Sequence, residues 1–176
     1  SANEPGPVDP AAMRRRCPDV IDVERFYDSL GRAGLDYGPA FRVVREIRRG
    51  EESVWARIER PARSASESER RADNEQENDS RGDGAYLLHP AILDGCFQAL
   101  LATTLGGERE PAAPYVPVSI ERLALYAPVT RACWCAGETR RADGDAVAGT
   151  LRLYGDDGAL LAEVEGVRAQ PVPRRA

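Results

Sequence analysis

One long apolar segment, residues 87–105 with the sequence LLHPAILDGCFQALLATTL, constrains the fold more than any other feature of the chain. At helical spacing its apolar side chains cover more than half of the helix circumference, which is typical of a helix buried inside a domain. Three polar residues interrupt it: His89, Asp94 and Gln98. No run reaches the roughly 18 unbroken apolar residues that a bilayer-spanning helix needs. The segment therefore predicts a core helix.

Strand patterns lie on both sides of this helix. Before it, alternating apolar residues predict a β-hairpin that follows an amphipathic helix over residues 22–30, with Asp22 as its N-cap. After it, four further strands predict a meander, because short connections favour antiparallel pairing. The expected strands are residues 41–49, 53–60, 118–126, 131–139, 146–154 and 160–169. The predicted fold class is α+β, although the pattern alone does not determine how the sheet wraps.

The remaining segments set the expected domain limits. Residues 1–18 hold four prolines and few apolar side chains, which predicts a tail or interdomain linker. Residues 62–84 contain no aliphatic side chain larger than Ala and no aromatic one, which predicts a disordered loop. The folded domain is expected over 19–172, with a short tail at 173–176. The chain opens on Ser1 rather than Met, which suggests a piece of a longer polypeptide.

Composition and charge exclude several classes of function. The net charge is −5, and the one basic triplet, Arg14 to Arg16, lies in the Pro-rich segment, so no nucleic-acid partner is expected. No secretory signal or spanning segment is visible, so we expect a cytoplasmic protein without a membrane partner. The four cysteines are expected to be reduced thiols. Neither metal-ligand spacing nor a nucleotide-binding motif occurs, and no metal or cofactor is expected.

Two polar residues on the buried helix are the first candidates for chemistry. Asp94 and Gln98 are four residues apart and therefore share one helix face. The Gln amide can donate to the carboxylate and orient it, while burial raises a carboxyl pKa toward the range of a general acid. The same pair is also compatible with a purely structural role, in which Asp94 braces the helix.

Two aromatic-ring residues are weaker candidates. His89 is the single histidine and lies about 140° around the helix from Asp94, so a direct dyad is not expected. His89 followed by Pro90 is typical of a helix start. Tyr37 precedes a rigid Gly-Pro turn, which would hold the phenol toward a substrate oxygen or leave it half-buried beside the turn.

Three motifs now define a family resemblance. Residues 37–41 (YGPAF) resemble the YGPxF motif of polyketide synthase dehydratase domains, and residues 89–98 (HPAILDGCFQ) resemble the HPALLD…Q stretch of that family. Residues 116–120 (VPVSI) resemble its LPFxW segment in part, with Val and Ile in place of Phe and Trp, a variation that leans toward iterative, enediyne-type synthases. The resemblance implies a hot-dog fold, in which an antiparallel sheet wraps around a long apolar helix.

The resemblance also implies a role. The family has two hot-dog halves, and the chain resembles the C-terminal one; the HxxxGxxxxP motif that supplies the catalytic histidine of the first half does not occur here. The implied activity, within a dimeric type I polyketide synthase, is dehydration of a β-hydroxyacyl chain carried on the phosphopantetheine of an acyl carrier protein. Asp94 and Gln98 would be catalytic, whereas Tyr37, His89 and Pro117 would contact substrate. Without its N-terminal hot-dog half, the chain is expected to be inactive.

Three other functions remain open for the same residues. One is a product template domain, which guides aldol cyclisation of a poly-β-ketone with a similar His–Asp pair. Another is a non-catalytic hot-dog scaffold. The last is a self-contained, homodimeric hot-dog thioesterase that would use His89 and Asp94, an arrangement that their angular offset disfavours.

Overall fold

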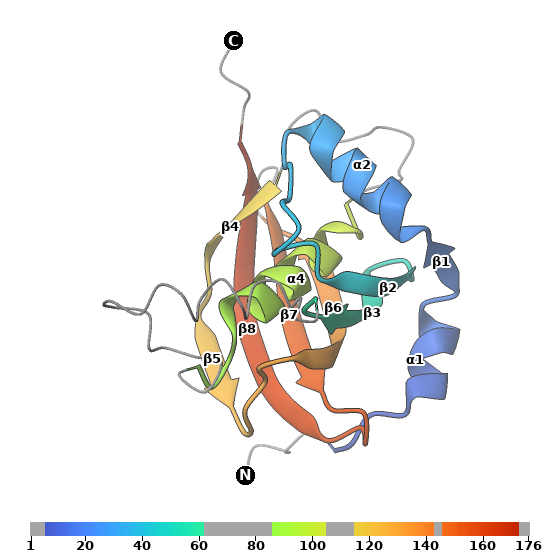
Figure 1. Cartoon of the computed structure of the whole chain (residues 1–176), viewed down its shortest axis with the longest axis vertical. Helices are drawn as coiled ribbons and strands as arrows, with labels where there is room; N and C mark the ends of the chain where they lie inside the picture. The colour runs from blue at the N-terminus through green and yellow to red at the C-terminus, as the bar shows by residue number, and fades with distance from the viewer. Residues whose placement is uncertain (1–5, 62–85, 105–114, 143–145, 173–176) are drawn as a thin grey trace, which may run out of the picture.

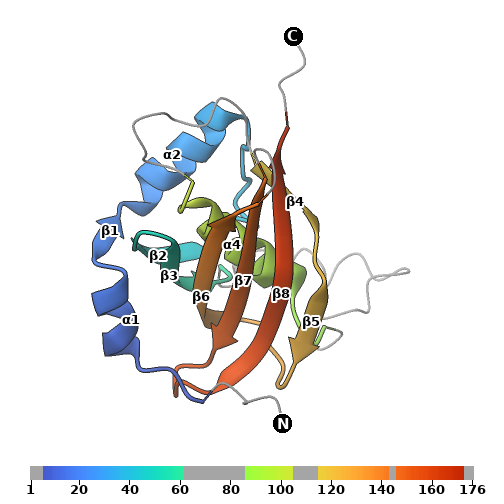
Figure 2. The same ribbon diagram turned by 180° about the vertical axis from the view of Figure 1, so that it is seen from behind.

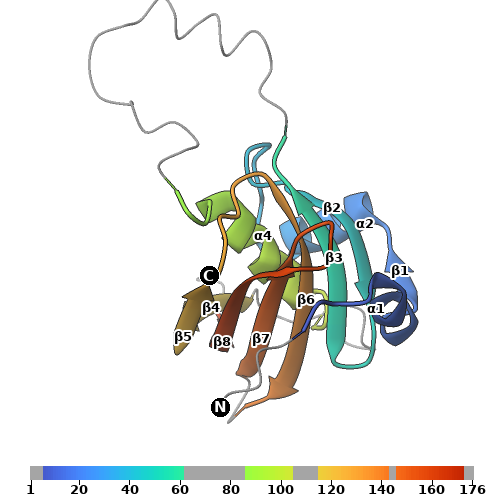
Figure 3. The same cartoon turned by 90° about the horizontal axis from the view of Figure 1, so that it is seen from below.

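The computed structural model describes residues 6–61, 86–104, 115–142 and 146–172, and within them one antiparallel sheet curves around a single central helix, α4 (Figures 1 and 3). The strand order is β1-β2-β3-β6-β7-β8-β4, and β5 also pairs with β8. This is the hot-dog arrangement. The elements are α1 (Pro10–Arg16), β1 (Asp19–Ile21), α2 (Val23–Ala33), β2 (Val44–Arg49), β3 (Ser53–Glu59), α4 (Pro90–Leu101), β4 (Tyr115–Ser119), β5 (Arg122–Leu125), β6 (Ala132–Arg141), β7 (Val147–Tyr154) and β8 (Leu160–Pro171).

Helix α4 confirms the prediction of a buried core helix. It begins as expected at His89, whose ring Nδ1 accepts the Ala91 N–H at 3.1 Å, and Pro90 occupies the first turn. The helix ends at Leu101, earlier than the apolar pattern suggested, and the hydroxyls of Thr103 and Thr104 donate to carbonyls of the last turn. Most of its apolar side chains join the core between helix and sheet: Ala91, Ile92, Cys96, Ala99, Leu100 and Leu101.

The hairpin before the helix is confirmed, but the four-strand meander is only partly so. Strands β6, β7 and β8 form a meander, as expected. The segment expected as one strand over 118–126 is divided into β4 and β5, and both pair with the last strand, β8. The pairing of β4 shifts register between Pro117 and Ser119, next to a residue without a backbone N–H. Sequence alternation gives strand positions but does not identify the pairing partner.

The N-terminal segment is more than a tail. Residues 10–16 form α1, which is capped by Asp9 through a 2.9 Å bond from the Ala11 N–H. The following residue, Cys17, is fully buried together with Trp55 and Tyr154 in a second cluster, apart from the core that surrounds α4. Trp55 stacks on Trp134 with ring centroids 5.1 Å apart. The prediction of a tail or linker therefore does not describe this part of 1–18, because Val8, Met13 and Cys17 pack in the cluster of Trp55 and Tyr154. Figure 2 shows α1 on the same side of the molecule as β2 and β3.

Two other expectations concern segments outside the described residues: the loop at 62–84 and the tail at 173–176. All four cysteines are free and buried, as the reduced-thiol prediction required. In the part of the chain that the structure covers, no helix is both long and apolar enough to cross a bilayer.

Candidate active site

Asp94 lies in the second turn of α4, half-buried, and is held by the residue one turn further on. Gln98 Nε2 donates to Asp94 Oδ2 at 2.7 Å. The i, i+4 contact predicted from the sequence is thus present. Burial raises the pKa of Asp94 above its ordinary value of 3.8, while the bond from Gln98 opposes that rise. The result is a carboxyl group that retains its proton to higher pH than an exposed Asp does.

Gln98 itself is completely buried, and each of its polar groups has a partner. Its Nε2 donates a second hydrogen bond, to the carbonyl oxygen of Phe41 at 2.8 Å. Its Oε1 accepts a hydrogen bond from the hydroxyl of Tyr27 at 2.9 Å. The Tyr27 oxygen in turn accepts the N–H of Val44 at 3.0 Å. A buried amide with all its bonds made is rigid, so the orientation of Asp94 is fixed by the protein interior.

Helix α2 supplies Tyr27, which the sequence analysis did not single out. The helix is amphipathic and starts at Asp22, whose side chain accepts the Arg25 N–H at 2.9 Å. It ends at Gly34, whose φ of 103° is the left-handed conformation that glycine adopts readily. Its buried face consists of Phe26, Tyr27 and Leu30. Helical spacing in the sequence is consistent with Tyr27 on this apolar face, but spacing alone does not indicate that its hydroxyl meets Gln98.

Tyr37 lies close to the same network. Its ring packs edge-on against the ring of Tyr27, with centroids 6.2 Å apart. Burial is the main cause that raises the pKa of Tyr37 well above its ordinary value, and the nearby Asp94 carboxylate raises it further. The phenol is therefore neutral at physiological pH and available as a hydrogen-bond donor. The Gly-Pro turn after it is closed by the N–H groups of Phe41 and Arg42, which both donate to the Gly38 carbonyl.

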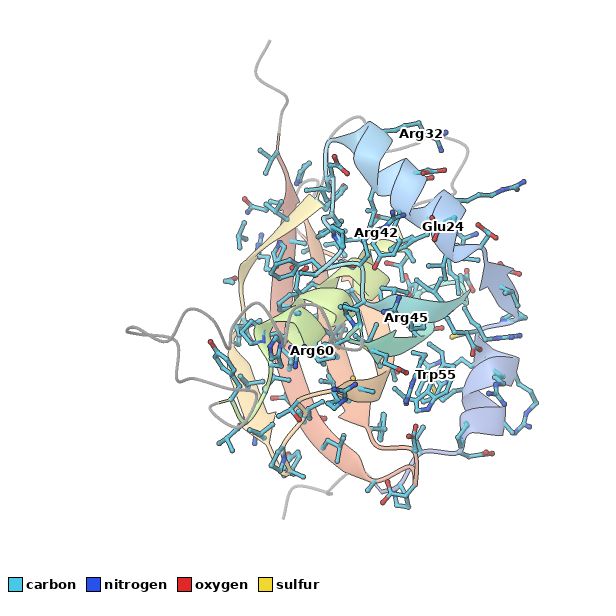
Figure 4. The ribbon with its side chains drawn as sticks, viewed as in Figure 1. Glu24, Arg32, Arg42, Arg45, Trp55 and Arg60 are labelled. Atoms are coloured by element: carbon cyan, nitrogen blue, oxygen red, sulfur yellow. The ribbon has the colours of Figure 1, made fainter. Side chains whose placement is uncertain are left out.

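An arginine covers the outer side of Tyr27. The guanidinium of Arg42 lies over the Tyr27 ring, 4.7 Å from its centroid. It also donates to Glu24 Oε2 at 3.1 Å, and Figure 4 labels both of these residues. This cation–π contact joins the loop before β2 to helix α2. The loop carries both Tyr37 and the Phe41 carbonyl, so the contact helps to hold two parts of the site together.

The other two predicted residues take different positions. His89 is half-buried at the start of α4, where its Nδ1 serves as the helix cap and its ring packs edge-on against Tyr86 at 5.4 Å. Pro117 is exposed on strand β4, opposite Ala169 of β8, at the edge of the sheet. The hydrogen bond between Gln98 and Asp94 thus unites two of the predicted residues, and Tyr37 lies beside them. His89 lies at the start of the helix and Pro117 at the edge of the sheet. Among the residues that the structure describes, no group of three or more metal-ligating side chains is present.

The raised pKa of Asp94 has a consequence for stability that can be measured. In the unfolded chain Asp94 ionises near pH 3.8, whereas in the folded protein it does so at a higher pH. Between these two values the folded state binds more protons, so the free energy of unfolding falls as pH rises. In Asp94→Asn this contribution is absent. Urea unfolding of both proteins from below pH 3.8 to neutral pH should show the variant gaining stability relative to the original chain as pH rises. A difference that stays constant with pH would contradict the burial of this carboxyl.

Comparison with known proteins identifies the family of this chain. The family model described as the polyketide synthase dehydratase N-terminal domain matches residues 5–176. Polyketide synthase GfsE of Streptomyces halstedii is 31% identical over 154 residues, which is 88% of this chain and 4% of that protein. The spectinabilin polyketide synthase system protein NorB of Streptomyces orinoci is 32% identical over 157 residues, 88% of this chain and 6% of that protein. The chain thus spans a small part of these relatives.

Solved structures agree on the fold. The dehydratase domain from the CurK module of curacin polyketide synthase is 26% identical, with a TM-score of 0.73, over 100% of this chain and 56% of that one. The CurJ dehydratase domain, at 22% identity, has a TM-score of 0.75 over 96% of this chain and 56% of its own. The fold and the comparisons together define a hot-dog domain that corresponds to about half of a polyketide synthase dehydratase domain. The chain belongs to the polyketide synthase dehydratase family.

Proposed function

We propose that this chain is the C-terminal half of a dehydratase of a type I polyketide synthase, and that Asp94 is its general acid. The observation that carries the proposal is the half-buried carboxyl of raised pKa, held at Oδ2 by a fully buried amide. A group of this kind keeps a proton and presents it in one direction, as proton donation to a leaving hydroxyl requires. The motif at residues 89–98 that the chain shares with the family contains both Asp94 and Gln98.

The assignment to the C-terminal half rests on the motifs rather than on the length. The chain is aligned with about half of the solved dehydratase domains, 56% in the case of the CurK domain. The matching family model is described as an N-terminal domain. The YGPAF and HPAILD motifs of this chain nevertheless resemble those of the second half in that family. The single histidine caps α4, which leaves it poorly suited to act as the base. The base would therefore come from the other half.

The proposed reaction divides between two groups. A base from the N-terminal half removes the α-proton of the β-hydroxyacyl thioester, and the electrons form the Cα=Cβ double bond as the Cβ–O bond breaks. Asp94 gives its proton to the departing oxygen, which leaves as water, and the carboxylate that remains accepts the bond from Gln98. In this proposal, Tyr37 donates a hydrogen bond to the same oxygen. His89 and Pro117 are proposed to contact the acyl chain away from the reacting carbons.

Exposed apolar side chains on strands β4 and β5 support an interface with another part of the same synthase. Strands β4 and β5, with the turn between them and the residue after β5, expose Val118, Ile120, Leu123 and Tyr126. Exposed apolar surface that lies together along one sheet edge favours a protein interface. We propose that the N-terminal hot-dog half covers this edge. An acyl carrier protein would deliver the substrate, in a dimeric cytoplasmic synthase.

The test is a reconstitution assay with a β-hydroxyacyl thioester on a carrier protein, followed by mass spectrometry. We expect no turnover by the 176-residue chain alone and loss of one water when it is joined to the upstream half. Turnover by this chain alone that is abolished in His89→Ala would instead show a self-contained hot-dog enzyme. A cyclised product from a poly-β-ketone substrate, with no dehydration of the hydroxyacyl substrate, would favour the product template function. Binding of the upstream half without either reaction would favour a scaffold.

A further inference from the structure

The hydroxyl of Tyr27 makes two hydrogen bonds whose direction is fixed. The Val44 backbone N–H can only donate, so the phenol oxygen accepts at this contact, at 3.0 Å. The hydroxyl proton is then directed at Gln98 Oε1, 2.9 Å away. Burial raises the pKa of Tyr27, so the proton that makes this contact is retained through the neutral range. The direction of the bond from Tyr27 to Gln98 is therefore set by the backbone of β2, because the Val44 N–H can only donate.

This fixed donor determines which end of the Gln98 amide faces Asp94. With Oε1 held by Tyr27, the Nε2 group faces two acceptors, the carbonyl of Phe41 at 2.8 Å and Asp94 Oδ2 at 2.7 Å. An amide rotated by 180° would place its oxygen against both of these acceptors. Because Gln98 is fully buried, water cannot relieve that repulsion. The network therefore permits one orientation of the amide.

We propose that Tyr27 is a positioning residue for the acid of this site: it fixes the polarity of Gln98, which occupies Asp94 Oδ2 and leaves Oδ1 as the oxygen that carries the proton toward substrate. This inference rests on the proposed function of Asp94 as proton donor. An oxygen that accepts an N–H bond is the less favourable place for the acid proton. During the reaction the Oδ1–H bond breaks, the proton joins the departing hydroxyl to give water, and the new carboxylate keeps its bond from Gln98.

The groups that face this network are few in the described part of the chain. Arg42 lies over the Tyr27 ring and pairs with Glu24, and Arg45 adds a second positive charge near the hydroxyl. Tyr37 packs against the Tyr27 ring and lies within electrostatic range of Asp94. Both arginines favour the ionised form of Tyr27, but burial outweighs them. The side chain that donates directly to Asp94 is Gln98, so its polarity controls the proton on that carboxyl.

The first test measures the Asp94 side chain itself, in the 176-residue chain, by NMR titration of its labelled carboxyl carbon. We expect both Tyr27→Phe and Gln98→Ala to raise the pKa of Asp94, because a weaker N–H donation disfavours the carboxylate. The matched control is Tyr154→Phe, which also removes the hydroxyl of a buried tyrosine, but in the cluster around Trp55. An unchanged Asp94 titration in folded Tyr27→Phe would overturn the proposal.

Two further readouts test the same network, the first without turnover and the second through turnover. In the unsubstituted chain, one Nε2 proton of Gln98 should shift as Asp94 titrates; if neither responds, the contact and the proposal both fail. In the protein with both halves, Tyr27→Phe should lower kcat about tenfold, the scale of one lost buried hydrogen bond, with KM little changed. The limb of the pH profile that reports the acid should move to higher pH, and Tyr154→Phe should leave it in place.

The outcomes separate this inference from the proposed function. The protein with both halves, which is this chain joined to the upstream half, could be inactive while Tyr27→Phe still raises the pKa of Asp94. That outcome would overturn the dehydratase function and leave the positioning role intact. The other outcome is that the protein with both halves is active and that Tyr27→Phe changes neither its kcat nor its pH profile. That outcome would overturn the positioning role alone.

Discussion

Replacement of Asp94 with Asn is expected to lower kcat of the two-half protein by about 10²- to 10⁴-fold, the usual contribution of one general acid. The change preserves shape, and the Asn carbonyl can still accept the bond that Gln98 Nε2 makes to Asp94 Oδ2 at 2.7 Å. What it removes is the proton for the leaving hydroxyl. KM should change little, because the variant keeps the volume and polarity of the site. The measurement is the rate of formation of the α,β-unsaturated product, compared at saturating substrate.

The control for this experiment is a carboxyl group outside the network. Asp22 caps α2 and is exposed, so Asp22→Asn, which keeps a capping oxygen, should leave kcat unchanged. Urea unfolding checks the fold of the variant, and Asp94→Asn is expected to be at least as stable as the original chain at neutral pH. Activity of Asp94→Asn within a few-fold of the unsubstituted enzyme would show that the acid lies elsewhere and that Asp94 only braces the helix.

The central pair of the site could be predicted from the sequence because it depends on one element alone. In a helix, residues four apart are neighbours whatever the rest of the fold does, so Asp94 and Gln98 had to meet. The same holds for His89, which starts α4 with its ring as the cap. Turn signals and apolar alternation likewise placed the hairpin of β2 and β3, because both are local properties of the chain.

Contacts between distant segments could not be predicted in this way. Tyr27 and Gln98 are separated by 71 positions, and they meet because α2 and α4 both pack against β2. The pairing of β4 and β5 with β8, rather than with β6, depends on the closure of the sheet around the helix. The burial of Cys17 against Trp55 also links distant segments, since local composition gave it the pattern of a tail. In each case tertiary packing determines which residues meet, and the pattern of a single sequence does not predict that packing.

The position of Asp94 depends on how closely its helix approaches the sheet, and the next residue makes that approach possible. Gly95 is buried in the face of α4 that lies against β2 and β3. A Cβ atom added there would overlap Val43 Cγ2 and lie 2.7 Å from Ile58 Cγ2. Both neighbours are fully buried methyl groups of β-branched side chains, which have little freedom to move. Only glycine allows α4 to approach near enough for Gln98 to reach the Phe41 carbonyl at 2.8 Å.

Substitution of Gly95 with Ala should therefore lower the free energy of unfolding by about 1–3 kcal/mol, although Ala is the better helix former. The matched control is Gly31→Ala in α2, where an added Cβ meets no atom within 4 Å. At that exposed site the same change should raise stability by about 0.5–1 kcal/mol through helix propensity alone. Urea unfolding of both variants gives the comparison, and opposite signs are expected. If Gly95→Ala is as stabilising as Gly31→Ala, the close approach of α4 to the sheet is not a constraint. If it is destabilising, the Asp94 titration should move with it, because the backbone shift that relieves the overlap also weakens the bond from Gln98 to the Phe41 carbonyl.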